Sequence, residues 1–570
     1  MIQVEQVIQQ KMPQLQQHPW LHKPTVVLLR SVLCERQIKT FAAQYPQLHG
    51  LEFVEHVLDF FDFTYSARDA EKDNIASQGR LIIVANHPIG SLDGLALLKL
   101  VSEVRSDVKV LANDMLMAVK PLQELLIPVA VFGKQGERAS FRAMQQHLEA
   151  DGALIIFPAG EVSRLSPVGV RDGKWYSGFV RLAQRTQTAI LPIFVGAHNS
   201  ALFYGASMLY KPLGTLLLVQ EMFKQQQRHI KFRIGEVIPA SALQGGDHAA
   251  SVHDIAAVVR KHLYRIGHDK VGLLRTQRPV ARAEPRQLLK RAIEACELLG
   301  ETADGHHIYH YRYQGNSTIL RELGRLREIA FRAVDEGTGR RRDLDNYDTW
   351  YQHLLLWSPQ DLEIAGAYRL GDCAEILAQH GVAGLYSHSL FRYSPAMDRY
   401  FSQGLELGRS FVQPRYWGRR SLEYLWQGIG ALLRRQPNYR YLFGPVTLSG
   451  ALPQQAKDAV VQFFSQHFVD AEQLAAGRTP YIAEQQPLAP PSADYSYDFA
   501  SLKQYLASMQ VAIPTLYKQY ADLCEPGGVR FLAFNIDADF ADAIDGLVMV
   551  DIAQLKASKR MRYIDAGSSA

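Results

Sequence analysis

A histidine and an aspartate lie close together in the sequence, just after a short apolar run. The run at residues 81–84 is bounded by polar residues, which favours a buried strand over a helix. His87 follows on a loop, and Gly90 gives that loop backbone freedom before Asp93 opens a helix. A neutral imidazole can take the proton of an alcohol that attacks a thioester, while a carboxylate on its other nitrogen stabilises the imidazolium. His87 and Asp93 are therefore candidates for acyl transfer, with a structural hydrogen bond as the alternative.

Three motifs of the N-terminal half resemble those of the glycerolipid acyltransferases. They are the Asn-His pair that ends at His87 and is followed by Asp93, the sequence FPAGE at 157–161, and the apolar strand at 189–193. The resemblance implies that His87 is the catalytic base and that the second motif holds the acyl acceptor. The interval between His87 and Asp93 is one residue longer than in the family, and Ala159 stands where the family has glutamate. We therefore expect an acceptor other than a glycerol phosphate.

Charged residues follow the second motif. Arg164 and Lys174 are candidates for holding an anionic group of the acceptor or of the acyl carrier, with solvated surface charge as the alternative. Glu161 is the only carboxylate close to this motif. It could orient a neighbouring group or bind an ammonium, which would suit an amino-acid lipid better than a phospholipid.

The length and composition indicate a globular protein of more than one domain. The chain has 570 residues, too many for one core at about 100–200 residues per domain, and it is 47% hydrophobic and 21% charged. Its four cysteines show no paired spacing, so we expect neither a disulfide framework nor a zinc site, and a reducing cytoplasmic compartment fits. The N-terminus lacks the pattern of a signal peptide, and no apolar run reaches the ~18 residues that span a bilayer. Any membrane contact is therefore expected from the surface.

The N-terminal half predicts an α/β fold. Residues 1–75 are expected to be helical, with apolar residues including Leu58 and Tyr65 on one face. From 76 to 258, apolar strands alternate with helical stretches, which predicts layers around a largely parallel sheet. The expected strands are 81–84, 108–111, 153–157 and 190–195. The uncharged stretch 187–210 is interpreted as a strand followed by an active-site loop. Active sites in such sheets lie at the carboxyl ends of strands.

Residues 259–304 are interpreted as a basic connector. Between Arg260 and Arg291 there are ten lysines and arginines against two acidic residues, and two prolines indicate a helix followed by an irregular linker. This stretch could contact anionic lipid headgroups or an acidic carrier protein, and a solvated face is the alternative. A nucleic-acid partner is not expected, because interleaved aromatic residues and a reader motif are missing.

Residues 305–570 predict a second domain, a mixed α/β one. A helical pattern at 326–334 is followed by strands at 353–357 and 364–370 that a turn joins into a hairpin. This order resembles the GNAT N-acyltransferase fold. The motifs HLLLWSPQDLEIAGAYRL, LELGRSFVQPRYWG and YLFGPVTLSG are similar to those of the ornithine–acyl carrier protein N-acyltransferases, a family similar to the acyl-homoserine lactone synthases.

That resemblance places Arg369, Glu406 and Arg409 at the polar positions of the motifs. Glu406 could take the ammonium proton of an attacking amine, and Arg369 or Arg409 could hold a carboxylate in a bidentate pair. A structural ion-pair network is the alternative. Gly418 precedes a helix, where related folds cradle the pyrophosphate or pantetheine of the donor. Arg420 stands there in place of a small residue, which favours a carrier-protein donor over free coenzyme A.

Together the two halves resemble the bifunctional ornithine lipid synthases. The resemblance implies N-acylation of ornithine by a 3-hydroxyacyl thioester in the C-terminal domain, followed by O-acylation of the lyso-lipid hydroxyl in the N-terminal domain. We expect acyl carrier protein or acyl-coenzyme A as donor, no tightly bound cofactor or metal, and a peripheral location on the inner face of the cytoplasmic membrane. Another amino acid such as glycine, a lysophospholipid acceptor, and a non-enzymatic haemolysin-like role are the alternatives.

Overall fold

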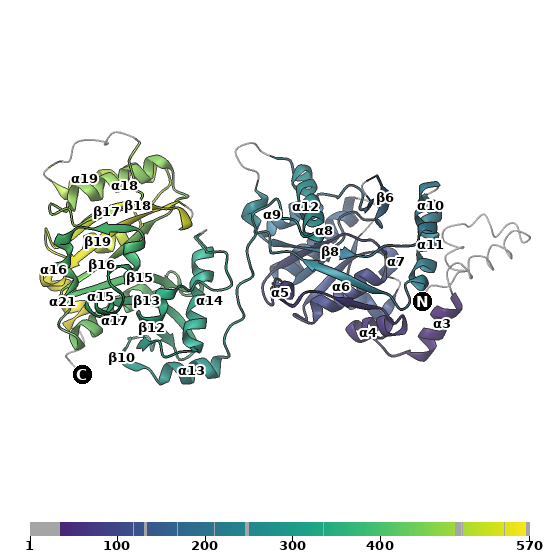
Figure 1. Ribbon diagram of the computed structural model, residues 1–570, viewed down its shortest axis with the longest axis horizontal. Coiled ribbons are helices and arrows are strands. Elements are labelled where there is room, and N and C mark those ends of the chain that lie inside the picture. Colours follow the sequence, from purple (N-terminus) through teal and green to yellow (C-terminus); the bar gives the residue numbers. More distant parts are fainter. Residues whose placement is uncertain are drawn as a thin grey trace, which may run out of the picture. The chain divides into compact units, whose positions relative to one another are not determined.

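The chain forms two compact units with separate sheets. The computed structural model describes residues 35–117, 119–129, 134–167, 169–209, 211–244, 250–334, 336–484, 492, 494–540 and 542–565. The units comprise residues 1–279 and 280–570 (Figure 1). Cys34 and the start of the predicted N-terminal helical segment lie outside the described residues.

The predicted connector is divided between the two units. Helix α12 (Val252–Gly267) packs into the core of the first unit through Val259 and Leu263. Helix α13 (Arg286–Glu294) packs into the second unit through Leu289 and Ile293. The basic residues of this stretch consequently lie on helices and loops that belong to one unit or the other.

The first unit contains a seven-stranded sheet in the order β1-β9-β8-β2-β5-β3-β4. All neighbouring strands are parallel except the antiparallel pair β8 and β9. The strands are β1 (Thr64–Ser66), β2 (Leu81–Ala85), β3 (Val108–Asn113), β4 (Leu126–Val129), β5 (Ala153–Ile156), β8 (Ala189–Gly196) and β9 (His229–Ile234). The predicted largely parallel α/β sheet is confirmed.

Both faces of this sheet are covered by helices, which explains why its central strand is apolar throughout. Ile82 and Val84 of β2 contact one core and Leu81 and Ile83 the other, because successive side chains of a strand point to opposite faces. Helices α4 (Gly50–Phe60) and α6 (Leu92–Ser102) cover one face; α8 (Lys134–Glu149), α9 (Gly178–Thr186) and α12 cover the other (Figure 1).

Two local predictions in this unit are wrong. Tyr65 lies in strand β1 and not on a helix, because residues 64–66 pair with β9. The stretch after β8 is not all loop, because residues 201–209 form helix α10 (Ala201–Leu209) with Phe203 and Tyr204 buried. Helix α11 (Lys211–Lys224) follows. A helix therefore lies where an active-site loop was expected.

Apolar side chains are exposed beside α10. Leu202 and Met208 of α10 are 65% and 72% exposed, and Tyr176 is 73% exposed. Strand β6 (Arg164–Ser166), which pairs with β7 (Gly169–Arg171), lies next to α10 and exposes Leu165. Within the described part of the chain, no helix combines the length and the hydrophobicity that crossing a bilayer requires.

The second unit contains an eight-stranded mixed sheet in the order β10-β11-β12-β13-β15-β16-β19-β18. Its strands are β10 (Glu297–Glu301), β11 (His307–Arg312), β12 (Gln352–Ser358), β13 (Glu363–Asp372), β15 (Gly404–Val412), β16 (Tyr441–Leu448), β18 (Val529–Asp537) and β19 (Ala543–Asp551). Strands β12 and β13 form the predicted hairpin. The predicted helix at 326–334 is the end of α14 (Thr318–Arg332). The predicted mixed α/β domain is confirmed.

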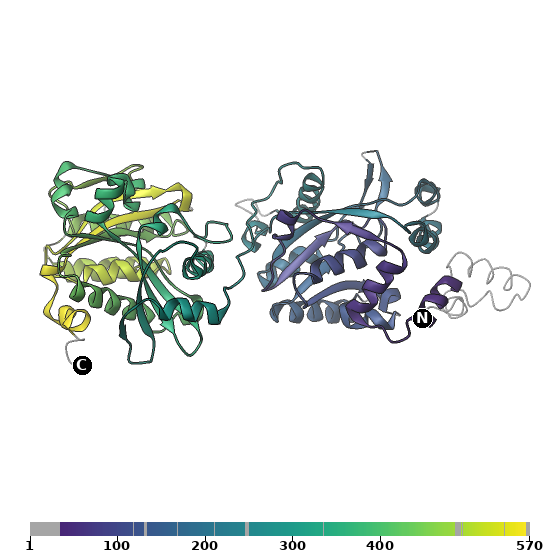
Figure 2. The same cartoon turned by 60° about the horizontal axis from the view of Figure 1, so that its bottom comes forward.

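Strands β15 and β16 diverge after a short parallel contact. They pair only at residues 404–406 and 441–443, although both strands continue beyond this point. Helices α17 (Ser421–Arg435) and α18 (Gln454–His467) pack on one face of the sheet, and α13 and α14 on the other (Figure 2). Beyond these residues the two strands separate, and a cavity lies between them.

Candidate active sites

His87 and Asp93 form the predicted pair at the carboxyl end of β2. His87 Nδ1 lies 3.1 Å from Asp93 Oδ2. Asp93 is fully buried and accepts the backbone N–H groups of Ile89, Gly90 and Gly94 at 2.9–3.1 Å. The carboxylate is therefore fixed in place, and the imidazole, 19% exposed, stays accessible from outside.

Gly90 lies in a tight turn between the histidine and the aspartate. It has a φ of +99°, a conformation that side chains other than glycine rarely adopt. A Cβ atom there would lie 2.7 Å from Val162 Cγ2. The turn between His87 and Asp93 therefore requires glycine at this position.

The two partners shift each other's pKa in the directions expected of a general base and its supporting carboxylate. Burial alone lowers the pKa of His87, but the Asp93 carboxylate outweighs it and raises the pKa above its usual range. Burial raises the pKa of Asp93, yet His87 and the backbone N–H groups hold it below its usual range. Asp93 is consequently charged and favours the protonated imidazole that forms when His87 takes a proton.

Asp172 also belongs to this site, although the sequence did not identify it as a site residue. Its Oδ1 accepts the backbone N–H of His87 at 3.2 Å and the Ser163 hydroxyl at 2.5 Å, and its Oδ2 accepts the Trp175 indole N–H at 2.9 Å. Ser163 also donates its backbone N–H to the His87 carbonyl at 2.9 Å. Asp172 thus ties the segment after the FPAGE motif to the histidine loop.

Two asparagines hold the ends of the loop. The side chain of Asn86 accepts the Val195 N–H at 2.7 Å and donates to the Val195 carbonyl at 3.0 Å. Asn199 donates to the carbonyls of Pro88 and Ile89, at 3.2 Å each. The Asn-His motif therefore joins β2 to β8 as well as placing the histidine.

The charged residues predicted to hold the acceptor lie in two groups. Arg164 lies 3.6 Å from Glu161 and hydrogen-bonds the Ser207 hydroxyl of α10, so these two candidates are together. Lys174 is exposed.

The ring of Phe157 lies 4.2 Å from that of His87, centroid to centroid, so the FPAGE motif contacts the histidine directly.

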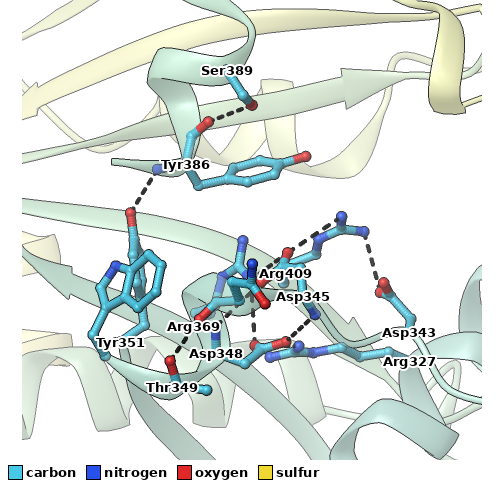
Figure 3. A network of polar contacts seen from close by, with 12 residues as sticks. Arg327, Asp343, Asp345, Asp348, Thr349, Tyr351, Arg369, Tyr386, Ser389 and Arg409 are labelled. Carbon is cyan, nitrogen blue, oxygen red and sulfur yellow. Dashed lines mark hydrogen bonds and ion pairs between the residues drawn. The ribbon is translucent and has the colours of Figure 1, made fainter. Parts of the chain in front are cut away.

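In the second unit, Arg369 lies at the centre of a buried polar network (Figure 3). It is fully buried, and its Nη1 contacts Asp345 at 2.6 Å and Asp348 at 3.3 Å. Arg327 pairs with Asp348 at 2.7 Å. Burial alone would raise the pKa of Asp348, but the two arginines hold this pKa well below its usual range. These contacts fit the alternative interpretation of Arg369 as part of a structural network.

Arg409 extends this network to the gap between β15 and β16. It lies 3.2 Å from Asp343 and 3.8 Å from Asp345, with the Tyr386 ring 5.3 Å from the guanidinium carbon (Figure 3). Its φ of +45° places it in the left-handed region, where β15 shifts register against β13. The bulge brings Arg409 into the lining of a cavity.

Glu406 lies on the same strand but is not among the residues lining this cavity. It is buried and accepts the Tyr351 hydroxyl and, at 2.6 Å, the Ser387 N–H. Burial raises the pKa of Glu406. A carboxylate with a raised pKa suits a proton acceptor, and both of its oxygens are held by neighbours.

The cavity has a volume of about 200 Å³ and lies between the diverging strands. Its wall combines polar and apolar side chains of β15, β16 and the segment after α19 (Tyr495–Ser508). Its ionisable and polar lining residues include Glu336, Tyr368, Arg409, Thr447, Asp537 and Asp545. The acidic members of this set were not singled out from the sequence, because they are far apart in it and belong to no motif.

Gly418 lies apart from the cavity. It is exposed, with a φ of +73°, in the loop before α17. Arg420 of the same loop bonds Glu423 at 2.8 Å. The structure thus brings Arg369 and Arg409 together at the Tyr386 ring. Glu406 is buried on β15 outside the cavity, and Gly418 lies on the surface.

Comparisons with known proteins match both units of the chain. A family model described as an acyltransferase matches residues 6–270, and one described as an acetyltransferase (GNAT) domain matches residues 326–427. The glycine N(alpha)-acyltransferase of Phocaeicola vulgatus is 30% identical over 49% of this chain and 91% of its own length. The lyso-glycine lipid O-acyltransferase of Bacteroides thetaiotaomicron is 29% identical over 42% and 89%. The L-ornithine N(alpha)-acyltransferase of Rhizobium meliloti is 30% identical over 35% and 64%.

The protein is an acyltransferase with O-acyltransferase and N-acyltransferase relatives. It belongs to the family of N(alpha)-acyltransferases that the Phocaeicola vulgatus protein represents, and it joins a GNAT domain to an N-terminal acyltransferase domain.

Proposed function

We propose that the chain is a bifunctional synthase of an aminolipid, with ornithine as the acylated amino acid. The observation that supports this proposal is that each unit contains its own candidate acyl-transfer site. One unit holds the His87–Asp93 pair, and the other holds the cavity beside Arg409. The names of the relatives include both an N(alpha)-acyltransferase and a lyso-lipid O-acyltransferase. One chain would therefore perform both steps.

The N-terminal unit would form the ester. His87 takes the proton of the 3-hydroxyl on the singly acylated lipid as its oxygen attacks the carbonyl carbon of an acyl thioester. The carbon–sulfur bond then breaks, and the thiolate receives the proton from the imidazolium. Asp93 stabilises that imidazolium, and Asp172 keeps the His87 backbone in position.

The C-terminal unit would form the amide. Arg409 binds the carboxylate of the amino acid, and the α-amine attacks a 3-hydroxyacyl thioester after losing a proton to a carboxylate. Glu406 is the predicted base, and its raised pKa supports the assignment. The reaction releases the thiol of an acyl carrier protein or of coenzyme A.

The exposed apolar side chains beside α10 support a membrane surface as the place of the second step. Leu202 and Met208 lie on α10, next to the strand that carries Arg164, and Tyr176 is exposed beside Gly160 of the FPAGE motif. A singly acylated lipid resides in a membrane, so a peripheral protein needs apolar side chains close to its site. We propose that this surface meets the inner face of the cytoplasmic membrane.

The test is a lipid extract of a bacterium that lacks aminolipids and expresses the full chain. Mass spectrometry should find a two-chain aminolipid with the wild type and a one-chain N-acyl amino acid with His87→Ala. Glu406→Ala should give neither product. The headgroup mass separates ornithine from glycine, the alternative that the names of four relatives favour. If folded wild-type protein produced no new aminolipid, the proposal would be contradicted. Detection of newly acylated lysophospholipid would then support the alternative that the protein acylates lysophospholipids.

A further inference from the structure

The ring of Tyr386 lies beside two arginines of the C-terminal unit. Its centroid is 4.8 Å from the guanidinium carbon of Arg369 and 5.3 Å from that of Arg409 (Figure 3). Both distances are within the ~6 Å over which the face of an aromatic ring attracts a cation. Burial raises the pKa of Tyr386 to about 12, so its hydroxyl stays neutral and the attraction is that of a ring, not of a phenolate. Tyr386 and Arg409 both line the cavity, so the ring acts on an arginine that a substrate can reach.

Few other contacts fix the Arg409 guanidinium. It lies 3.2 Å from Asp343 and 3.8 Å from Asp345, and its Nε is buried without a hydrogen-bond partner within the described structure. The ring of Phe540 is farther away than that of Tyr386, with its centroid at 5.8 Å. Two guanidinium groups at one ring also repel each other, and the ring face offsets part of that repulsion. The Tyr386 ring is therefore a main determinant of where this guanidinium lies.

The backbone of the same segment contacts the predicted base. Tyr386 donates its backbone N–H to the Tyr351 hydroxyl at 2.8 Å, and this hydroxyl donates in turn to Glu406. Ser387 donates its backbone N–H to the same carboxylate at 2.6 Å. The segment thus contacts Glu406 through its backbone and Arg409 through a side chain. A change of the Tyr386 side chain should affect Arg409 and leave the hydrogen bonds to Glu406 in place.

We propose that Tyr386 is a positioning residue of the amide-forming site, where its ring holds the Arg409 guanidinium in place for the α-carboxylate of the amino acid. The inference rests on the proposed function and adds a residue through which the carboxylate is recognised. A guanidinium that turned freely would bind the carboxylate less tightly, because ordering it on binding costs free energy. The carboxylate takes no part in the bond that forms, so this contact acts on binding and not on the chemical step.

The test compares two replacements of Tyr386 that differ in the ring. Tyr386→Phe keeps the ring and removes the hydroxyl, whereas Tyr386→Leu removes both. KM and kcat for N-acylation are measured with the purified full chain and a 3-hydroxyacyl thioester. Tyr386→Leu should raise KM for L-ornithine about tenfold, the effect of losing a partly desolvated cation–π contact, and should leave kcat within about twofold of the wild type. Tyr386→Phe should retain the wild-type KM.

A second substrate shows whether the ring acts through the carboxylate. L-Ornithinamide has an amide in place of the carboxylate and cannot form an ion pair with Arg409. The wild type should bind it more weakly than L-ornithine, and Tyr386→Leu should leave its KM unchanged. Glycine and glycinamide replace this pair if the wild type acylates glycine. Retained acylation of the amide shows that a variant is folded, and Tyr386→Met, which also lacks the ring, is used if Tyr386→Leu does not fold.

Tyr400 provides a matched control in the same unit. Its ring also lies beside two arginines, 4.9 Å from the guanidinium carbon of Arg399 and 5.2 Å from that of Arg530. Tyr400 is not among the residues lining the cavity. Tyr400→Leu should therefore leave both KM values as in the wild type. A rise in KM as large as that of Tyr386→Leu would show that such contacts act through the fold, and would overturn the assignment.

Failure of this inference differs from failure of the proposed function. An unchanged KM in the variant without the ring, an equal rise for L-ornithine and L-ornithinamide, or equal impairment of Tyr386→Phe and Tyr386→Leu would overturn the role of the ring alone. Acylation of no amino acid by folded wild-type protein would overturn the proposed function, and this inference with it.

Discussion

The two units present candidate acyl-transfer sites of opposite design. The first consists of two residues six positions apart, His87 and Asp93, fixed by the backbone of one loop. The second draws on charged residues from distant segments, arranged around a cavity between diverging strands. The difference fits the two acceptors that we propose. A neutral hydroxyl needs a base to attack a thioester, whereas an amine attacks on its own once it is neutral and bound. The first site is therefore built around a base, and the second around charged groups that bind the amino acid.

The sharpest test of this difference is Asp93→Asn. The variant keeps the shape but removes the charge that stabilises the imidazolium, so O-acylation should fall by about 10²- to 10⁴-fold. N-acylation by the same preparation should be unchanged and serves as the internal control. The rates are measured with singly acylated lipid in vesicles and with free amino acid. An equal fall in both activities would contradict a role confined to the first site.

The second prediction concerns the buried network. Arg369→Met leaves Asp345 and Asp348 without their buried cation, which should cost about 3–5 kcal/mol and lower the unfolding transition of the C-terminal unit. The matched control is Arg420→Met, which removes an exposed pair with Glu423 and should cost less than about 1 kcal/mol. Differential scanning calorimetry of the full chain measures both. Similar small effects would show that the network contributes no stability.

The third prediction separates collision from backbone strain at the histidine loop. Gly90→Ala places a methyl group 2.7 Å from Val162 and also strains the backbone, so it should cost about 1–3 kcal/mol and reduce O-acylation but not N-acylation. Gly79→Ala is the control, because Gly79 also has a positive φ but a Cβ atom there meets nothing within 4 Å. Thermal unfolding and both activities are compared. Equal effects of the two variants would mean that the collision is unimportant.

The smallest expected effect is a displaced pH profile. O-acylation requires neutral His87, so kcat/KM should fall as the pH drops through the His87 pKa, which lies above its usual value because of Asp93. In Asp93→Asn that support is lost while burial remains, so the residual activity should fall at a lower pH than in the wild type. The measurement is kcat/KM for O-acylation between pH 5 and pH 9. Coincident profiles would show that the aspartate does not set the histidine pKa.

The sequence predicted what is local. His87 and Asp93 lie on one loop, and the apolar strands on either side have clear boundaries, so both could be inferred from residue types and spacing. Arg369, Glu406 and Arg409 were found through motifs. Asp172, 85 positions from His87, could not be found, because the hydrogen bond that gives it a role joins two distant segments. The acidic lining of the cavity escaped prediction for the same reason.

Strand β1 and helix α10 show a second limit of sequence reasoning. Thr64–Ser66 becomes a strand only through pairing with β9, which no local pattern reveals. The segment 201–209 contains glycine and serine and follows polar residues, which indicated a loop, yet its apolar residues pack as a helix. In both cases tertiary contacts decide the local structure.

The boundary between the units has a consequence for how such a gene can change. Gln277 exchanges backbone hydrogen bonds with Val237 of the first unit, and four residues later Ala281 donates its backbone N–H to the carbonyl of Arg341 in the second. Only a few codons therefore separate one complete core from the next. Splitting or joining the reading frame there interrupts no strand or helix, so the two activities can be inherited as one protein or as two.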